Sequence, residues 1–250
     1  MKKIRVAILD NPIYSPLVQN IDKVAEEFSY EVFKLNEPQI TKFILENKFD
    51  LMLVNPYILA RTFKFADLRI VPTRIIASVS YTNQASINFK GNLRTISELF
   101  VSNKEDFLTK VALILLSERY NLFPEAKNYS NLGELSEDSC SLIYNDSGKQ
   151  GQLDLSEDFF ETYEMPLINA FWIVRNEEEP LKLKEFIEKC YDKEINDEFS
   201  IKEIRDSEII REGSIITKWS SEIQNALEQI YQLLYLRHFI DEIPAVKLME

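Results

Sequence analysis

The residues IRVAILDNP, Ile4 to Pro12, carry the pattern that decides the fold. The short apolar run predicts a buried strand, which stops at Asp-Asn-Pro because proline has no amide hydrogen to give to a sheet. The same pattern returns in DLMLVNP, Asp50 to Pro56. Between the two lie a helical pattern, a second strand and a second helical pattern: SPLVQNIDKVAEEF, YEVFKL and EPQITKFILENK. Strands that alternate with helices predict a parallel α/β sheet, since parallel neighbours need a crossover connection.

Polar residues follow the first and third predicted strands where each strand ends. Asn11 and Asn55 both precede a proline, and Pro56 lies in the second of these loops. Ligands of open α/β sheets bind at the carboxyl ends of the strands, so these residues are candidates for ligand contact. Each asparagine also has a plain alternative, because an Asx-turn that ends a strand uses the same side chain. Both interpretations stay open from the sequence.

The rest of the chain predicts further strands and helices with no low-complexity linker between them. Strands are expected in LRIVPTRIIASVSY, QASINFK, SCSLIYND and the run from Pro166 to Val174. A helix is expected in SNKEDFLTKVALILLSERYNLF, with Ser102 or Asn103 as its N-cap. Beyond Pro180 we predict helices only, in LKLKEFIEKCYDK, IKEIRDSEIIREG and SSEIQNALEQIYQLLYLRHFIDEI. Without a linker, the chain is expected to cross between two lobes through strands.

Composition excludes several classes of function. A net charge of -12 repels nucleic acid and anionic membrane surfaces, so neither is an expected partner. Only 5 glycines are present, which leaves no glycine-rich phosphate loop. Cys140, Cys190 and the single histidine, His238, match no metal-ligand spacing, and two reduced thiols are the favoured interpretation. The short apolar run at the N-terminus is no secretory signal, so we expect a cytoplasmic protein without metal.

Six segments, in order, resemble the MqnA/MqnD menaquinone-biosynthesis family. DLSEDFFETYEMPLINAFWIVRN is similar to the family segment D-L-x-x-x-W-x-x-x-T-G-x-P-F-x-x-A-x-W and keeps Asp154, Leu155, Pro166, Ala170 and Trp172. The opening IRVAILDNPIYSPL and the later FDLMLVNPYILAR, ASINFK, FLTKVALILL and SLIYND fall in the family order. Together these segments span about residues 4 to 175. Trp172 itself is expected in the core, since a buried aromatic stripe is most often packing.

The resemblance implies an α/β, two-lobed, type 2 periplasmic-binding-protein-like fold with a ligand cleft between the lobes. Lobe 1 is expected to comprise residues 1–83 plus 173–250, and lobe 2 residues 84–172. The implied activity is that of a chorismate dehydratase, a lyase that removes water from chorismate to give 3-[(1-carboxyvinyl)oxy]benzoate. The reaction needs no cofactor, and the implied ligand is a small anionic molecule, chorismate or a related carboxylate.

The resemblance also assigns roles to individual residues. It implies Asn11 and Asp146 as catalytic residues and Asn55, Pro56, Ser86 and Thr109 as substrate-binding residues. Asp146 is a candidate general acid or base, with the capping of a turn as the alternative. Ser86 and Thr109 would donate hydroxyl hydrogen bonds to a carboxylate. For Thr109 this role requires that its helix begin near that residue.

The sequence departs from the family at several points, two of them in the proposed site loops. Ile13 falls on the asparagine of the family's first loop, and Lys110 stands in place of a serine in the anion loop. A non-catalytic small-carboxylate-binding protein on the same fold is therefore a second hypothesis. A third is a partner protein that forms a homodimer through the amphipathic C-terminal helix.

Overall fold

The computed structural model describes residues 3–129, 136, 138–144, 151–175, 179–191, 196–205 and 209–249. The chain divides into two compact units that each gather separate stretches of sequence. Unit 1 comprises Met1–Ala77, Ile168–Phe199 and Ile216–Glu250, and unit 2 comprises Ser78–Leu167 and Ser200–Ile215. Every boundary falls within a strand, so the chain does pass between the units through strands, as the sequence predicts.

Unit 1 contains the predicted parallel strands. β1 (Arg5–Leu9) pairs in parallel with β2 (Glu31–Leu35) on one side and with β3 (Leu51–Val54) on the other. The predicted helices follow each strand, although the first is broken into α1 (Ser15–Val18) and α2 (Ile21–Phe28). β3 is fully buried, which explains its continuous apolar sequence.

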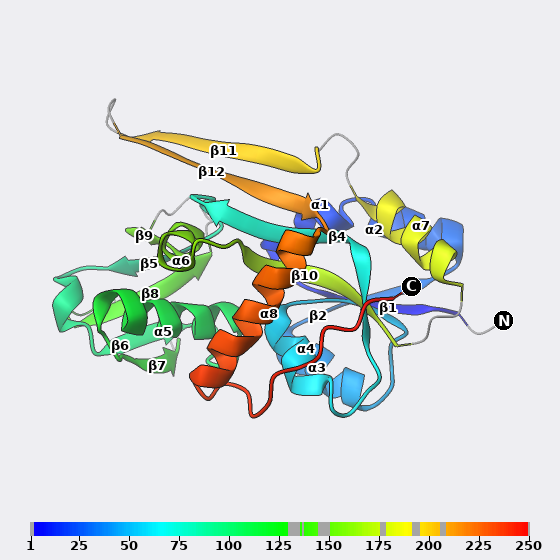
Figure 1. The fold of residues 1–250 in the computed structure, drawn as a ribbon, viewed down its shortest axis with the longest axis horizontal. Coiled ribbons are helices and arrows are strands. Elements are labelled where there is room, and N and C mark those ends of the chain that lie inside the picture. The colour runs from blue at the N-terminus through cyan, green and yellow to red at the C-terminus, as the bar shows by residue number, and fades with distance from the viewer. Residues whose placement is uncertain are drawn as a thin grey trace. The chain divides into compact units, whose positions relative to one another are not determined.

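The next strand of this sheet is antiparallel to its neighbour β3. β10 (Leu167–Val174) pairs with β3 in the antiparallel sense, with Trp172 opposite Leu53. All of β10 is buried, and Trp172 has no exposed surface, so its predicted core position is confirmed. The order of the seven-stranded sheet is β11 (Glu198–Arg205), β12 (Ile209–Lys218), β4 (Arg69–Ser80), β10, β3, β1 and β2 (Figure 1).

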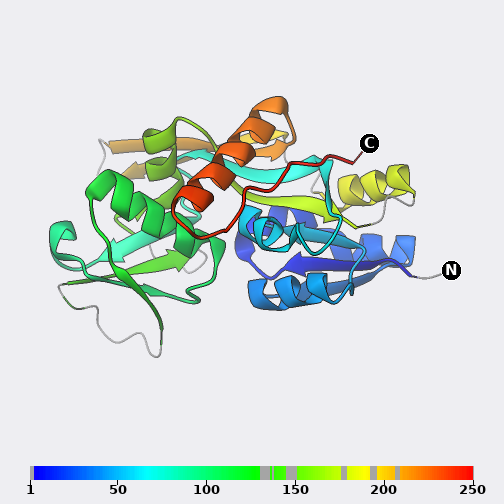
Figure 2. The same ribbon diagram turned by 60° about the horizontal axis from the view of Figure 1, so that its bottom comes forward.

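The helices of unit 1 pack against one another. α2 packs against α7 (Pro180–Cys190), and α4 (Pro56–Thr62) packs against α8 (Ser221–Leu236) (Figures 1 and 2). α3 (Glu37–Leu45) also contacts α4. None of the helices within the described ranges is long and apolar enough to cross a membrane.

The segment after α7 corrects the sequence prediction. The described residues of IKEIRDSEIIREG are not helical: β11 (Glu198–Arg205) and β12 (Ile209–Lys218) are neighbouring strands that extend the sheet beyond β4 (Arg69–Ser80). Isoleucine and threonine prefer strands because their branched side chains are restricted in helices, and Gly213 weakens a helix further. Residues 200–215 group with unit 2, whereas all of 173–250 was predicted to belong to lobe 1.

Unit 2 is built on a five-stranded sheet of order β7-β6-β8-β5-β9. Its strands are β5 (Ala85–Phe89), β6 (Glu98–Val101), β7 (Glu125–Asn128), β8 (Ser139–Tyr144) and β9 (Leu153–Asp154). α5 (Phe107–Tyr120) and α6 (Leu155–Tyr163) pack against each other, and α6 also contacts β5 and β9 (Figure 2). α5 begins at Phe107 with Asp106 as its N-cap residue, later than the predicted cap at Ser102 or Asn103.

Candidate functional site

Three asparagines end the three parallel strands of unit 1. Asn11 follows β1, Asn36 follows β2 and Asn55 follows β3, so all three lie at the carboxyl edge of neighbouring strands. The side-chain oxygen of each accepts a hydrogen bond of 3.0 Å from a backbone amide two or three residues later. Each asparagine therefore caps the helical turn that follows its strand, and for Asn11 and Asn55 a local turn contact of this kind is the plain alternative that the sequence left open.

Asn55 has a further property that the capping role does not use. Its side chain has no exposed surface, and its Oδ1 accepts from the amide of Ile58, which fixes the orientation of the carboxamide. Its Nδ2 makes no hydrogen bond with any described residue, and the buried Pro56 follows it as the first residue of α4. An unpaired buried donor costs about 1–3 kcal/mol, so a water or a ligand oxygen would gain by pairing with it.

The two predicted hydroxyls of unit 2 are engaged with backbone. The Ser86 oxygen accepts from the amide of Gly151 at 3.0 Å, and a Cβ at Gly151 would lie 2.4 Å from that oxygen. The Thr109 hydroxyl donates to the carbonyl of Asn103 at 2.9 Å. A ligand carboxylate at Thr109 would have to replace this bond. Asp146 lies outside the described residues.

The start of α5 is electrostatically different from the anion loop that the resemblance implies. Asp106 stands at the N-cap, and burial raises the pKa of its carboxyl group. Thr109 is the third residue of the helix, and the neighbouring Lys110 forms an ion pair of 3.6 Å with Glu105. A cation and a carboxylate thus already occupy the region around Thr109.

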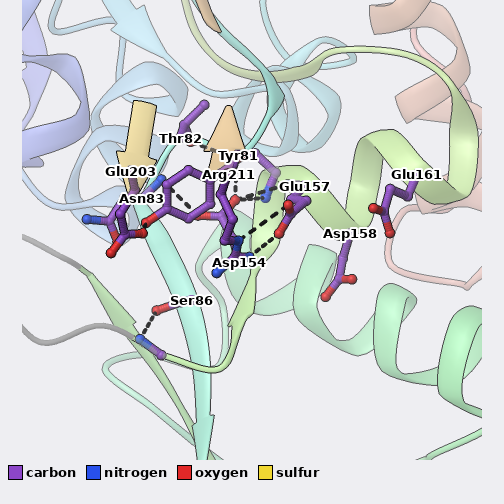
Figure 3. Close-up of polar contacts among 12 residues, drawn as sticks. Tyr81, Thr82, Asn83, Ser86, Asp154, Glu157, Asp158, Glu161, Glu203 and Arg211 are labelled. Carbon is purple, nitrogen blue, oxygen red and sulfur yellow. Dashed lines mark hydrogen bonds and ion pairs between the residues drawn. The ribbon is translucent and has the colours of Figure 1, made fainter. Parts of the chain in front are cut away.

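A dense polar network in unit 2 surrounds the turn that joins β4 to β5 (Figure 3). Asp154 caps α6, because its Oδ1 accepts from the amides of Ser156 at 3.1 Å and Glu157 at 3.0 Å. Its Oδ2 accepts from the amide of Asn83 at 2.8 Å, and burial raises the pKa of this carboxyl group. Asp154 therefore joins the Tyr81–Asn83 turn to the start of α6, a role that the family resemblance did not assign.

The same turn is held from a second direction by β11 and β12. Tyr81 donates its hydroxyl hydrogen to Glu203, and the guanidinium of Arg211 lies 4.2 Å from the centre of the Tyr81 ring. Arg211 also forms an ion pair with Glu157 on α6, with a second contact of 3.4 Å between Nε and Oε1. Figure 3 shows Glu157 pointing toward Arg211, whereas Asp158 and Glu161 point away from it.

Sequence reasoning missed Arg211 because it predicted a helix for this segment. The signal that could have found the strand is the run of isoleucines and threonine from residue 209 to 217, with Gly213 inside it. A Cβ at Gly213 would lie 2.2 Å from the carbonyl oxygen of Tyr81, so only glycine lets β12 approach β4 this closely.

A second arginine of unit 2 joins α5 to α6. Arg119 contacts Asp158 at 3.3 Å and forms an ion pair with Glu161. The hydroxyl of Tyr120 donates to Asp158 at 3.0 Å. Burial raises the pKa of Asp158 to about 6, against the lowering effect of Arg119.

Unit 1 has a polar pocket of about 650 Å³ beside α7. Arg74 lies 4.1 Å from the centre of the Tyr191 ring and forms ion pairs with Glu188 at 2.8 Å and with Asp197 at 2.7 Å. The charges that line the pocket are therefore paired with one another. In the part of the chain that the structure describes, no group of three or more His, Cys, Asp or Glu residues could hold a metal ion.

No family model matches the chain, and no curated protein sequence matches it. Solved structures do. Protein AF1704 from Archaeoglobus fulgidus is 12% identical, with a TM-score of 0.62 over 95% of this chain and 98% of that one. An ABC transporter protein from Parabacteroides distasonis is 10% identical, with a TM-score of 0.55 over 100% of this chain and 99% of that one.

A third likeness is to a nutrient-binding protein from Burkholderia cenocepacia bound to methionine. It is 13% identical, with a TM-score of 0.50 over 75% of this chain and 91% of that one. At these identities the likenesses establish the fold alone. The chain has a two-lobed, periplasmic-binding-protein-like α/β fold, which confirms the predicted fold class.

Proposed function

We propose that the protein binds a small carboxylate. The observation that carries the proposal is the Nδ2 of Asn55, a buried donor without a partner among the described residues. Asn55 lies at the carboxyl edge of β3, where α/β sheets bind their ligands. A carboxylate or hydroxyl oxygen is the acceptor that such a donor requires.

Two further observations support this choice. The fold is shared with a nutrient-binding protein that binds methionine, itself a small carboxylate. The net charge of -12 repels anions at long range, so binding has to come from donors placed at short range, such as a fixed carboxamide.

The ligand we propose is chorismate, and the proposed reaction is its dehydration. The reaction removes the C3 proton and the C4 hydroxyl group, and the gain of aromaticity favours it. Asn11 and Asp146 are the proposed catalytic residues, by resemblance to the MqnA/MqnD family. Ser86 and Thr109 remain proposed carboxylate donors, with Asn55 and Pro56 at the edge of β3. Positioning of the substrate can supply a large part of the rate enhancement.

The test is calorimetric titration of the purified protein with chorismate, together with mass spectrometry of the incubated mixture for loss of water. Binding with loss of water supports the lyase. Binding without any product would support the carboxylate-binding function and would refute the enzymatic one. Absence of both refutes the proposal.

A pair of variants examines the role of the Asn55 carboxamide. Asn55→Ser keeps a capping oxygen but removes Nδ2, so we expect chorismate affinity to fall about tenfold, the loss of one hydrogen bond. Asn36→Ser is the matched control, since Asn36 also caps a helix after a parallel strand but is exposed. Equal affinities for the two variants would show that the Asn55 donor has no part in binding.

A further inference from the structure

Trp172 carries a buried donor without a partner, as Asn55 does. Its side chain has no exposed surface, and its Nε1 makes no hydrogen bond with the described residues. The ring fills the core, but the indole N–H only donates, and its direction is fixed by the ring. Asn55 has a fixed direction too, because its bond from the amide of Ile58 orients the carboxamide and leaves Nδ2 unpaired.

The sheet places these two donors on the same face of neighbouring strands. Trp172 of β10 lies opposite Leu53 of β3, and Asn55 lies two residues beyond Leu53 with an extended backbone. Side chains two residues apart in an extended strand point to the same face. Diagonal neighbours across two strands lie about 7–8 Å apart, within reach of an aromatic side chain. Both residues belong to unit 1.

The other unpartnered groups among the described residues of unit 1 lie elsewhere or have no fixed direction. Arg175 follows β10 at its other end, where its amide donates to the carbonyl of Asp50 before β3. The hydroxyl groups of Thr73 and Tyr231 rotate about their C–O bonds. The indole and carboxamide donors thus form a directed pair near the carboxyl edge of β3, where α/β sheets bind their ligands.

Two donors without a free acceptor beside them favour a carboxylate. The indole has no acceptor, and the carboxamide oxygen of Asn55 already accepts from the amide of Ile58. A hydroxyl group between the donors would need an acceptor for its own hydrogen, whereas a carboxylate oxygen only accepts. Bonds from N–H groups to an ionised oxygen are also roughly twice as strong as bonds to a neutral one.

We propose that the indole N–H of Trp172 and the Nδ2 of Asn55 hold one carboxylate oxygen of the ligand between them. The inference rests on the proposed function and adds Trp172 to it as a binding residue. The pair selects a carboxylate over a hydroxyl group, because it offers donors alone.

The first experiment observes the indole N–H groups directly by nuclear magnetic resonance. The chain has 2 tryptophans, so full-length protein labelled with nitrogen-15 at tryptophan gives one indole signal for each, and Trp219→Phe assigns them. On titration with chorismate we expect the Hε1 signal of Trp172 to move downfield, because a bond to a carboxylate deshields the proton. The signal of Trp219 stays in place. A magnetisation-transfer contact between Hε1 of Trp172 and water that persists at saturating chorismate would mean a structural water only, and would refute the proposal.

Calorimetric titration with chorismate measures what the donor contributes to affinity. Trp172→Phe keeps an aromatic ring in the core but removes the N–H, and we expect affinity to fall about tenfold, the loss of one hydrogen bond. Trp219→Phe is the matched control, because it removes the indole N–H of a half-buried ring, and its affinity stays at the wild-type value. Circular dichroism and thermal unfolding show whether Trp172→Phe is folded; if it is not, the spectra of the wild-type protein decide.

The outcomes separate this inference from the proposed function. A downfield shift of Trp172 together with weaker binding by folded Trp172→Phe supports the inference. If wild type binds chorismate while the Trp172 signal stays in place and folded Trp172→Phe binds as tightly, the role of Trp172 is refuted and the proposed function stands. If wild type does not bind chorismate, both proposals fail.

Discussion

Replacement of Asp158 by asparagine is expected to stabilise the protein at neutral pH. Asp158 is 7% exposed, and burial raises its pKa to about 6 from an ordinary value of 3.8. A raised pKa in the folded state means that the folded protein binds the proton more tightly than the unfolded chain. Between pH 4 and pH 6 the folded state therefore holds more protons, and its stability falls as pH rises through this window.

The magnitude follows from the size of the pKa shift. A shift of about two units at about 1.36 kcal/mol per unit gives about 3 kcal/mol as an upper value for the loss. Asparagine cannot ionise, and its side-chain oxygen can still accept from the hydroxyl of Tyr120. The stability of Asp158→Asn relative to wild type should thus grow by about 2–3 kcal/mol between pH 4 and pH 7.

Urea unfolding at several pH values, followed by circular dichroism, measures this difference. Glu161→Gln is the control for loss of a charge beside Arg119, and its half-exposed ion pair should cost less than about 1 kcal/mol at pH 7. Parallel stability curves for Asp158→Asn and wild type across the window would refute the reasoning. They would mean that burial does not disfavour the Asp158 carboxylate.

Three further predictions concern packing and reactivity. Gly213→Ala places a Cβ 2.2 Å from the carbonyl oxygen of Tyr81, so overpacking should cost about 2 kcal/mol or more in thermal unfolding. Asp154→Ala removes a helix cap and leaves backbone amides without an acceptor, so we expect a loss of about 2–4 kcal/mol, and a change below 1 kcal/mol would contradict the capping role. Cys140 and Cys190 are buried, and burial raises the pKa of both thiols to about 12, so a disulfide reagent at pH 8 should label them only after unfolding.

Local sequence was sufficient for the first half of unit 1 and for the start of α6. Asn55-Pro56 predicted the end of β3, because the asparagine oxygen and the proline ring each act within a few residues; α4, which the same two residues begin, was not predicted. Asp154 caps α6 through the amides of the next residues, a local contact, and Trp172 lies in the buried β10, as the sequence predicted. These features depend on residues that are close in the chain, so a local sequence pattern can predict them.

The ribbon of β11 and β12 could not be predicted in this way. The charged segment from residue 201 to 213 allows either a helix or a strand, and the choice depends on β4 as a pairing partner. The start of α5 was also misplaced, because Ser102 and Asn103 are ordinary cap residues, yet Asn103 instead accepts from Glu105 within a turn. Tertiary contacts selected among local conformations of similar energy.

The sequence by itself determined the alternation of strands and helices, the Asn-Pro ends of two parallel strands and the apolar core of the sheet. All of these rest on interactions between residues that are close in the chain or on burial of apolar side chains. Only the tertiary structure decided that Arg211 meets Glu157 and that the Asn55 donor has no partner among the described residues. The first depends on the pairing of strands far apart in sequence, and the second on whether the surrounding fold provides an acceptor, which a local sequence pattern does not record.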